Sequence, residues 1–265
     1  MPGLYIPRGL TDGSGMWPLD GIAAGWWPVA GVGAGLIIGS FLATLLRRWP
    51  AGRTLGGRSA CDGCGRRLGV AELVPLLSYM VQRGRCRGCG TAIDWRHPAT
   101  EAGCALVGGV ALVIVPGVWG FASALLGWAL LALLLLDVTH YWLPDRLTWP
   151  LLGLGLLLGP APFAERVLAA AIAGGALLAL SLAYRALRGR DGLGLGDVKL
   201  ATALGAWLSP PLLAPLLLLA AALGLLMALG LRLRRGELAA DMRLPFGACL
   251  AAAGFPLHLA LAGGG

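Results

Sequence analysis

The sequence predicts an all-α membrane protein that crosses the bilayer about eight times and carries a small cytosolic insertion after its first helix. Three observations predict this class. Hydrophobic residues make up 57% of the 265 residues and charged residues only 13%, whereas soluble domains carry about twice that share of charge. Apolar runs such as WALLALLLLD and LLAPLLLLAAALGLLMALGLRL have the composition of membrane-crossing helices. A polar, cysteine-rich block interrupts the apolar pattern after the first of these runs.

The expected elements follow one another along the chain. Residues 1–28 form an irregular N-terminal tail, which lacks the charged start and apolar core of a signal peptide. The first transmembrane helix covers 29–46, the cytosolic block 47–98, and a larger transmembrane domain 99–265. Within that domain we expect seven further spans, at 100–115, 118–136, 147–161, 165–184, 198–209, 212–231 and 247–261. The spans at 147–161 and 198–209 are shorter than the ~20 residues of a full crossing, so we expect tilt, local thinning or shielding by neighbours.

The positively charged residues predict the orientation. With eight spans, the loops at 47–98, 137–146, 185–197 and 232–245 lie on one side of the membrane. Nineteen of the 21 Lys and Arg residues fall on that side or at its helix ends, and the exceptions are Arg8 and Arg166. Positive residues stay in the cytoplasm, so this side is cytosolic and the N-terminus lies outside. The net charge of +8 therefore reports orientation in lipid, and we expect no nucleic-acid partner.

The cytosolic block contains two paired cysteine motifs. The pattern is C-x2-C, 21 residues, C-x2-C, formed by Cys61, Cys64, Cys86 and Cys89. Two such knuckles place four thiolates around one ion tetrahedrally, which predicts a zinc-ribbon-like domain with structural zinc. Four cysteine ligands leave no open position, so the metal is not expected to be catalytic. Redox-active thiols and unpaired cysteines are the alternatives, and a cytosolic position disfavours disulfides.

Two aspartates lie at the ends of predicted spans on the same side of the membrane. Asp137 ends the leucine-rich third span, and Asp197 follows a glycine-rich link, GLGLG, at the start of the sixth. Two carboxylates from different helices at one depth can share a proton and activate a water molecule, one as base and the other as acid. The alternative is that each aspartate caps a helix or reaches into water. In the catalytic interpretation, Gly194 and Gly196 let backbone and substrate approach.

Other polar residues near these aspartates have simpler interpretations. Asp145 follows Pro144 in a good N-cap context, so we expect a structural or supporting role. Lys199 either pairs with an aspartate or extends to the interface. His140 is expected to be solvated or hydrogen-bonded in a loop.

Several ordered motifs resemble one known family, the bacterial type IV prepilin peptidases, which are membrane aspartyl proteases of the GxGD type. The resemblance covers about residues 31–255. It is carried by GSFLATLLRRWP, by the cysteine knuckles flanking VPLLSYMVQRGRC, and by DWRHPATE, DVTHYWLPD, GLGLGDVKLATALGAW and LPFGACLA. Two positions depart from the family pattern: Ala43 replaces the usual Asn after Gly-Ser-Phe-Leu, and Asp62 stands in the first knuckle where Pro is common.

The resemblance implies a function. Family members cleave the leader peptide of prepilins or pseudopilins at the cytosolic face of the bacterial inner membrane, and by the family pattern Asp137 and Asp197 are the catalytic pair. Many members also methylate the new N-terminal amine with S-adenosylmethionine, an activity associated with the cytosolic block. The expected partners are therefore prepilin or pseudopilin substrates and membrane lipid. Two other functions remain open from the residues alone: an ion- or proton-coupled transporter, because intramembrane aspartates suit one, and a membrane-tethered zinc scaffold.

Overall fold

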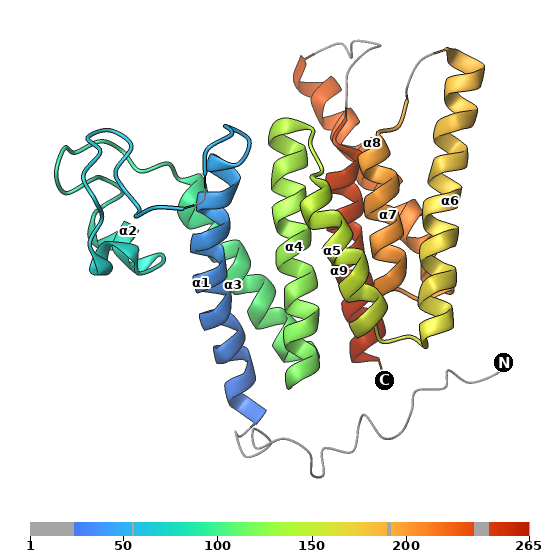
Figure 1. The fold of residues 1–265 in the computed structure, drawn as a ribbon, viewed down its shortest axis with the longest axis horizontal. Coiled ribbons are helices and arrows are strands. Elements are labelled where there is room, and N and C mark those ends of the chain that lie inside the picture. Colours follow the sequence, from blue (N-terminus) through green and yellow to red (C-terminus); the bar gives the residue numbers. More distant parts are fainter. Residues whose placement is uncertain (1–23, 55, 190–191, 236–243, 265) are drawn as a thin grey trace. The chain divides into compact units, whose positions relative to one another are not determined.

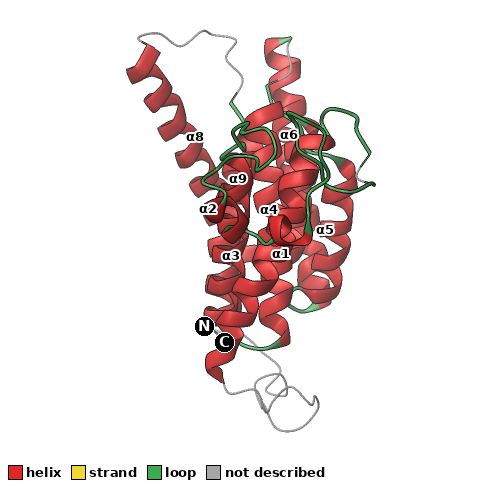
Figure 2. Cartoon of the chain, turned by 90° about the vertical axis from the view of Figure 1, so that its left-hand side faces the viewer, coloured by secondary structure: helices red, strands yellow, loops and turns green. Residues whose placement is uncertain are grey.

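The structure, a computed structural model, describes residues 24–54, 56–189, 192–235 and 244–264. Figure 2 shows only helices and loops in this part of the chain. Eight helices of 13 or more residues lie within it and match the eight expected segments in order. They are α1 (Trp27–Arg48), α3 (Arg96–Ile114), α4 (Val118–His140), α5 (Asp145–Leu158), α6 (Phe163–Arg188), α7 (Leu195–Trp207), α8 (Leu213–Arg235) and α9 (Phe246–Gly263) (Figure 1). The shorter elements are η2 (Ala24–Trp26), η3 (Val70–Leu73), α2 (Leu77–Val81) and η4 (Pro210–Leu212).

Six of the long helices, all except α5 and α7, are long and apolar enough to cross a membrane, counting the described residues alone. The chain is therefore a multi-pass membrane protein. Helix α5 has 14 residues and α7 has 13, so each is only about 20 Å long at 1.5 Å per residue. The sequence-based expectation that these two segments are short is confirmed. The expected irregular tail falls mostly outside the described residues, and helix α1 already begins at Trp27.

The described residues form two compact units that divide within α4, between Trp128 and Ala129. In the unit that ends at Trp128, glycines line the contact between α1 and α3. A Cβ added to Gly35 would come within 2.7 Å of the Ala105 Cα, and one added to Gly39 within 2.6 Å of the Glu101 Cα. Small residues at four-residue spacing let two helix backbones approach closely in lipid. The α1–α3 pair thus forms a tightly packed antiparallel hairpin, with the cysteine block connecting its two helices.

The unit that begins at Ala129 is built around α7. This short helix packs against α5, α6 and α9, and its residues from Leu200 to Trp207 are buried except for Thr202, which is half-buried. The Trp207 indole N–H donates to the Leu151 carbonyl oxygen at 2.9 Å. Since neighbouring helices cover α7, its ends are not required to reach both lipid surfaces. Its N-terminus instead presents Asp197 inside the bundle.

Candidate functional site

Asp137 lies in the last turn of α4 and is held by the start of α9. Only 5% of its surface is exposed. Its Oδ2 atom accepts a hydrogen bond from the Ala248 backbone N–H at 2.8 Å. Ala248 belongs to the first turn of α9, where backbone N–H groups have no partner inside the helix. This arrangement satisfies a buried N–H and places the Asp137 carboxylate at the positive end of a helix dipole.

Asp197 lies in the first turn of α7, immediately after the glycine-rich link. It is 9% exposed, and its backbone N–H donates to the Gly194 carbonyl oxygen at 3.1 Å. A Cβ added to Gly194 would come within 3.3 Å of Asp197 Oδ2, and one added to Gly196 within 3.1 Å of the Leu143 Cβ. Neither glycine has a positive φ. These glycines therefore allow close approach, rather than an unusual backbone turn.

The two carboxylates meet beside Gly247, the second residue of α9. A Cβ built on Gly247 would lie 2.9 Å from Asp197 Oδ1 and 3.0 Å from Asp137 Oδ2. Both oxygens therefore lie within 3.0 Å of one point, although their helices are separated by long stretches of sequence. Hydrogen bonds between oxygens span about 2.5–3.0 Å, so one water molecule is able to contact both carboxylates. The arrangement supplies two acids, one of which becomes a base when the pair shares a proton.

Three polar residues near the two aspartates are Lys199, Asp145 and His140. Lys199 donates from Nζ to both carboxylate oxygens of Asp145, at 2.7 and 2.9 Å, which is one of the two arrangements left open from the sequence. Asp145 is the first residue of α5 and makes no side-chain cap; Pro144 occupies the N-cap position. The pair joins the N-termini of α5 and α7. His140 is exposed at the end of α4, with Nδ1 at 2.6 Å from the Thr139 hydroxyl.

Sequence reasoning gave no role to Gly247 and Ala248. Both lie in LPFGACLA, whose proline and glycine at the start of an apolar run signalled a helix N-terminus. That signal predicts free N–H groups, but it does not say which side chain they meet.

The four cysteines of the block between α1 and α3 converge. Their Sγ atoms all lie within 4.8 Å of one another, and the Cys61 and Cys89 Sγ atoms are 3.7 Å apart. A tetrahedron with Zn–S bonds of about 2.3 Å requires sulfur atoms about 3.8 Å apart. The donor set therefore fits zinc in both chemistry and size.

The two knuckles share one backbone plan. The Cys61 N–H donates to the Arg66 carbonyl oxygen and the Gly65 N–H to the Cys61 carbonyl oxygen, at 2.8 and 2.9 Å. The second knuckle repeats both bonds from Cys86 and Gly90. Gly65 and Gly90 have φ values of 70° and 72°, a left-handed conformation that glycine adopts at least cost. The C-x2-C-G spacing thus predicts the turn as well as the ligands.

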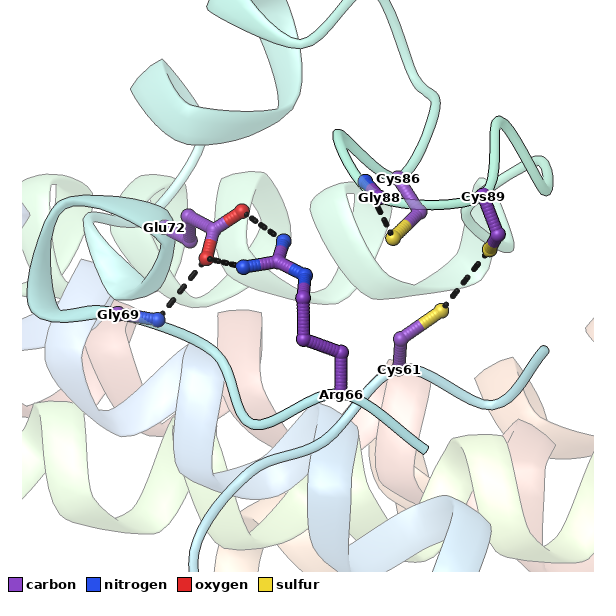
Figure 3. Close-up of polar contacts among 7 residues, drawn as sticks. All are labelled: Cys61, Arg66, Gly69, Glu72, Cys86, Gly88 and Cys89. Carbon is purple, nitrogen blue, oxygen red and sulfur yellow. Dashed lines mark hydrogen bonds and ion pairs between the residues drawn. The ribbon is translucent and has the colours of Figure 1, made fainter. Parts of the chain in front are cut away.

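Arg66 and Glu72 brace this cluster (Figure 3). The Arg66 guanidinium donates twice to the Glu72 carboxylate, at 2.6 and 3.1 Å, and the Gly69 N–H donates to Glu72 Oε2 at 2.9 Å. The hydrogen bonds from Arg66 and then from Gly69 lower the pKa of Glu72. The Arg66 side chain also lies against Gly88, where an added Cβ would be 3.0 Å from its Nε. Arg66 therefore brings positive charge from the first knuckle to the second.

Backbone amides also favour the thiolate form of one ligand. Hydrogen bonds from the Cys89 and Gly88 backbone lower the pKa of the Cys86 thiol to about 6. The Gly88 N–H lies 3.4 Å from the Cys86 Sγ. Thiolates are the metal-binding form of cysteine, so the second knuckle is prepared for a cation.

Comparison with known proteins gives a consistent result. The bacterial peptidase A24 N-terminal domain family matches residues 34–115, and the type IV leader peptidase family matches residues 124–229. A prepilin leader peptidase/N-methyltransferase of Aeromonas salmonicida (strain A449) is 41% identical over 204 residues, covering 75% of this chain and 69% of the relative. The same protein of Dickeya chrysanthemi is 37% identical over 253 residues, covering 83% and 88%. That of Pseudomonas putida is 34% identical over 259 residues, covering 83% and 86%. No solved structure matches the chain.

Proposed function

Because the chain belongs to the type IV leader peptidase family, peptidase A24, we propose that Asp137 and Asp197 are the catalytic pair of a prepilin leader peptidase/N-methyltransferase. The observation that carries this assignment is that both carboxylates lie within 3.0 Å of one point beside Gly247. The enzyme is an aspartic endopeptidase, and its substrates are prepilins or pseudopilins.

The geometry supports a water-activating mechanism. One carboxylate of the pair is ionised and removes a proton from the bound water, while the other donates a proton to the scissile amide. Asp137 is the better candidate for the ionised partner, because the Ala248 N–H donates to it and the α9 dipole favours negative charge there. Asp197 then holds the shared proton. Lys199, Asp145, Gly194 and Gly196 support the pair by fixing the start of α7.

The cysteine cluster has a structural role in this proposal. Cys61, Cys64, Cys86 and Cys89 hold one zinc ion as a zinc-ribbon-like domain, which fixes the two knuckles to each other. Four thiolates fill the tetrahedral positions, so no water molecule is activated there. S-adenosylmethionine is the methyl donor for the second activity.

The membrane arrangement follows from charge and helix length. All eight long helices lie in the bilayer of the bacterial inner membrane, six as full spans and α5 and α7 as shorter segments shielded by neighbours. The N-terminus lies outside, and the ends of α4 and α7 that carry the aspartates lie at the cytosolic face. The substrate leader therefore stays in the cytosol, and the apolar segment of the substrate enters among the helices.

Mass spectrometry of reaction products tests the function directly. Purified protein is incubated with a prepilin, with and without S-adenosylmethionine, and the products are weighed. We expect loss of the leader in both reactions and one added methyl group only with the donor. An intact substrate, together with proton or solute uptake in liposomes containing the protein, would support the transporter interpretation instead. Partner binding without any product would support a zinc scaffold.

A further inference from the structure

A buried carboxylate fixes part of the cytosolic block to a membrane-spanning helix. Glu101 is only 4% exposed, although it lies within α3. Its Oε2 atom accepts a hydrogen bond from the Leu76 backbone N–H at 2.8 Å, and its Oε1 atom lies 3.3 Å from His97 Nε2. A buried carboxylate requires such partners. The segment around Leu76, between η3 and α2, is thereby tied to α3.

Leu76 has an unusual backbone conformation at this attachment. Its φ and ψ values are 57° and −49°, and the Leu77 N–H lies 2.6 Å from the Pro75 carbonyl oxygen. This is a γ-turn with positive φ, a rare and strained type. Strained residues persist only where surrounding contacts over-determine them. We infer that contacts such as the Glu101 hydrogen bond fix the position of this segment against α3.

The hydrogen bond between Leu76 and Glu101 lies between the ends of α1 and α3, and not beyond them. Glu101 is five residues inside α3, which begins at Arg96, so it lies about 7–8 Å along the helix. It packs against Gly39, nine residues before the end of α1, about 13 Å along that helix. Figures 1 and 2 both show α2 alongside α1 and α3 rather than beyond the end of α1. The η3–α2 segment consequently lies beside α1 and α3, between the ends of these helices.

The surface of this segment is apolar and has no cover among the described residues. Met80 is 72% exposed, and the other large exposed apolar side chains of the segment, which with it form the η3–α2 patch, are Val70, Leu73, Val74, Leu77 and Val81. Arg83 and Arg85 follow α2 directly and are exposed. Apolar side chains bordered by arginine are typical of segments that lie in a membrane interface, and an exposed Trp beside Arg96 at the start of α3 fits that level.

We propose that the η3–α2 patch inserts into the leaflet at which α1 ends and α3 begins, and that its partner is anionic phospholipid. The apolar side chains enter the upper acyl region, and Arg83 and Arg85 contact phosphate groups. Ile37, on the membrane-spanning helix α1 of the same unit, is 70% exposed, which is about the exposure of Met80 in the patch. Docking holds the cysteine knuckles at the membrane surface, and it does not depend on the catalytic assignment.

Photo-crosslinking tests this docking in the full-length protein. The photoreactive residue p-benzoylphenylalanine replaces Met80, and the protein is placed in nanodiscs of phosphatidylethanolamine and phosphatidylglycerol. Matched variants carry the probe at Ile37, on the exposed face of a membrane helix, and at Thr54, in the exposed polar loop after α1. Zinc content and size-exclusion profiles confirm that each variant is folded.

After irradiation, intact mass spectrometry identifies the product. We expect the Met80 variant to gain the mass of one phospholipid, as the Ile37 variant does, and the Thr54 variant to gain none. Replacing phosphatidylglycerol with a zwitterionic lipid should lower the Met80 yield but not the Ile37 yield. An unmodified Met80 variant, a crosslink within the chain or to a second copy, or a crosslink only to an added prepilin would overturn the proposal.

Discussion

A single methyl group placed between the two aspartates provides a sharp test of the site. Gly247→Ala adds a Cβ that would lie 2.9 Å from Asp197 Oδ1, 3.0 Å from Asp137 Oδ2 and 2.5 Å from Leu143 Cδ1. The Leu143 methyl group is the end of a flexible side chain and is able to rotate away. The carboxylates must instead move by a few tenths of an ångström, and the methyl group takes volume beside the expected water position. Gly247 has no positive φ, so Ala is able to adopt its backbone conformation without strain.

The expected magnitude follows from catalytic geometry. A misplacement of about 1 Å in a reacting group is able to cost about 100-fold in rate. The carboxylates move by less than this, but the methyl group also displaces the water molecule, so kcat should fall by at least about ten-fold, or about 1.4 kcal/mol of transition-state free energy, and by at most about 100-fold. The assay is the initial rate of leader release from a purified prepilin, followed by mass spectrometry, alongside a thermal melt.

A matched control separates this effect from a general glycine effect. Gly153 lies in α5 of the same unit, and a Cβ added there meets no atom within 4 Å. The Gly153→Ala variant should cleave the prepilin at the wild-type rate. Wild-type cleavage by Gly247→Ala, with Gly153→Ala unchanged, would refute the inference that the carboxylates share a water beside Gly247.

Three further predictions concern the supporting residues and the metal centre. Lys199→Met should slow cleavage by less than about ten-fold, because the ion pair between Lys199 and Asp145 is partly exposed and contributes about 1 kcal/mol or less. A loss of cleavage as complete as that expected for Asp137→Asn would show that Lys199 acts in the chemistry. Glu72→Gln should weaken zinc binding by about ten-fold, because Arg66 loses a charged partner beside the cluster. Competition with a chromophoric chelator measures the zinc affinity. An unchanged affinity would exclude the proposed role of Glu72 in holding Arg66 beside the cysteines. Cys86→Ser should lower the bound zinc and the melting temperature together, since metal binding is coupled to folding, and full zinc content in this variant would contradict a four-cysteine site.

The order and approximate positions of the helices could be predicted because hydrophobic length and charge report them directly. The predicted spans at 29–46 and 165–184 correspond to α1 and α6, which extend by a few residues at each end. Charged residues such as Arg47 and Arg185 lie within the last helical turns, because a helix continues past the apolar core into the interface. Composition alone therefore placed the segments correctly but ended several of them early.

Asp137 and Asp197 could be selected as candidates from the sequence because each interrupts an apolar pattern at the same predicted membrane face. Gly247 could not, since glycine is frequent in packed membrane helices and its role depends on the approach of α9 to α4 and α7. Glu101 was a charged residue inside a predicted span, yet its partner is the backbone N–H of Leu76. That bond depends on a strained turn which no local sequence pattern specifies.

Asp137 and Asp197 are proposed to act as one catalytic unit. The most direct measurement is the rate of prepilin cleavage by Asp137→Asn, Asp197→Asn and the double variant, each checked for folding and zinc content. We expect each single variant to lose cleavage and the double variant to be no slower than either, because the effects of residues that act together are not additive. Wild-type cleavage by either folded single variant would contradict it.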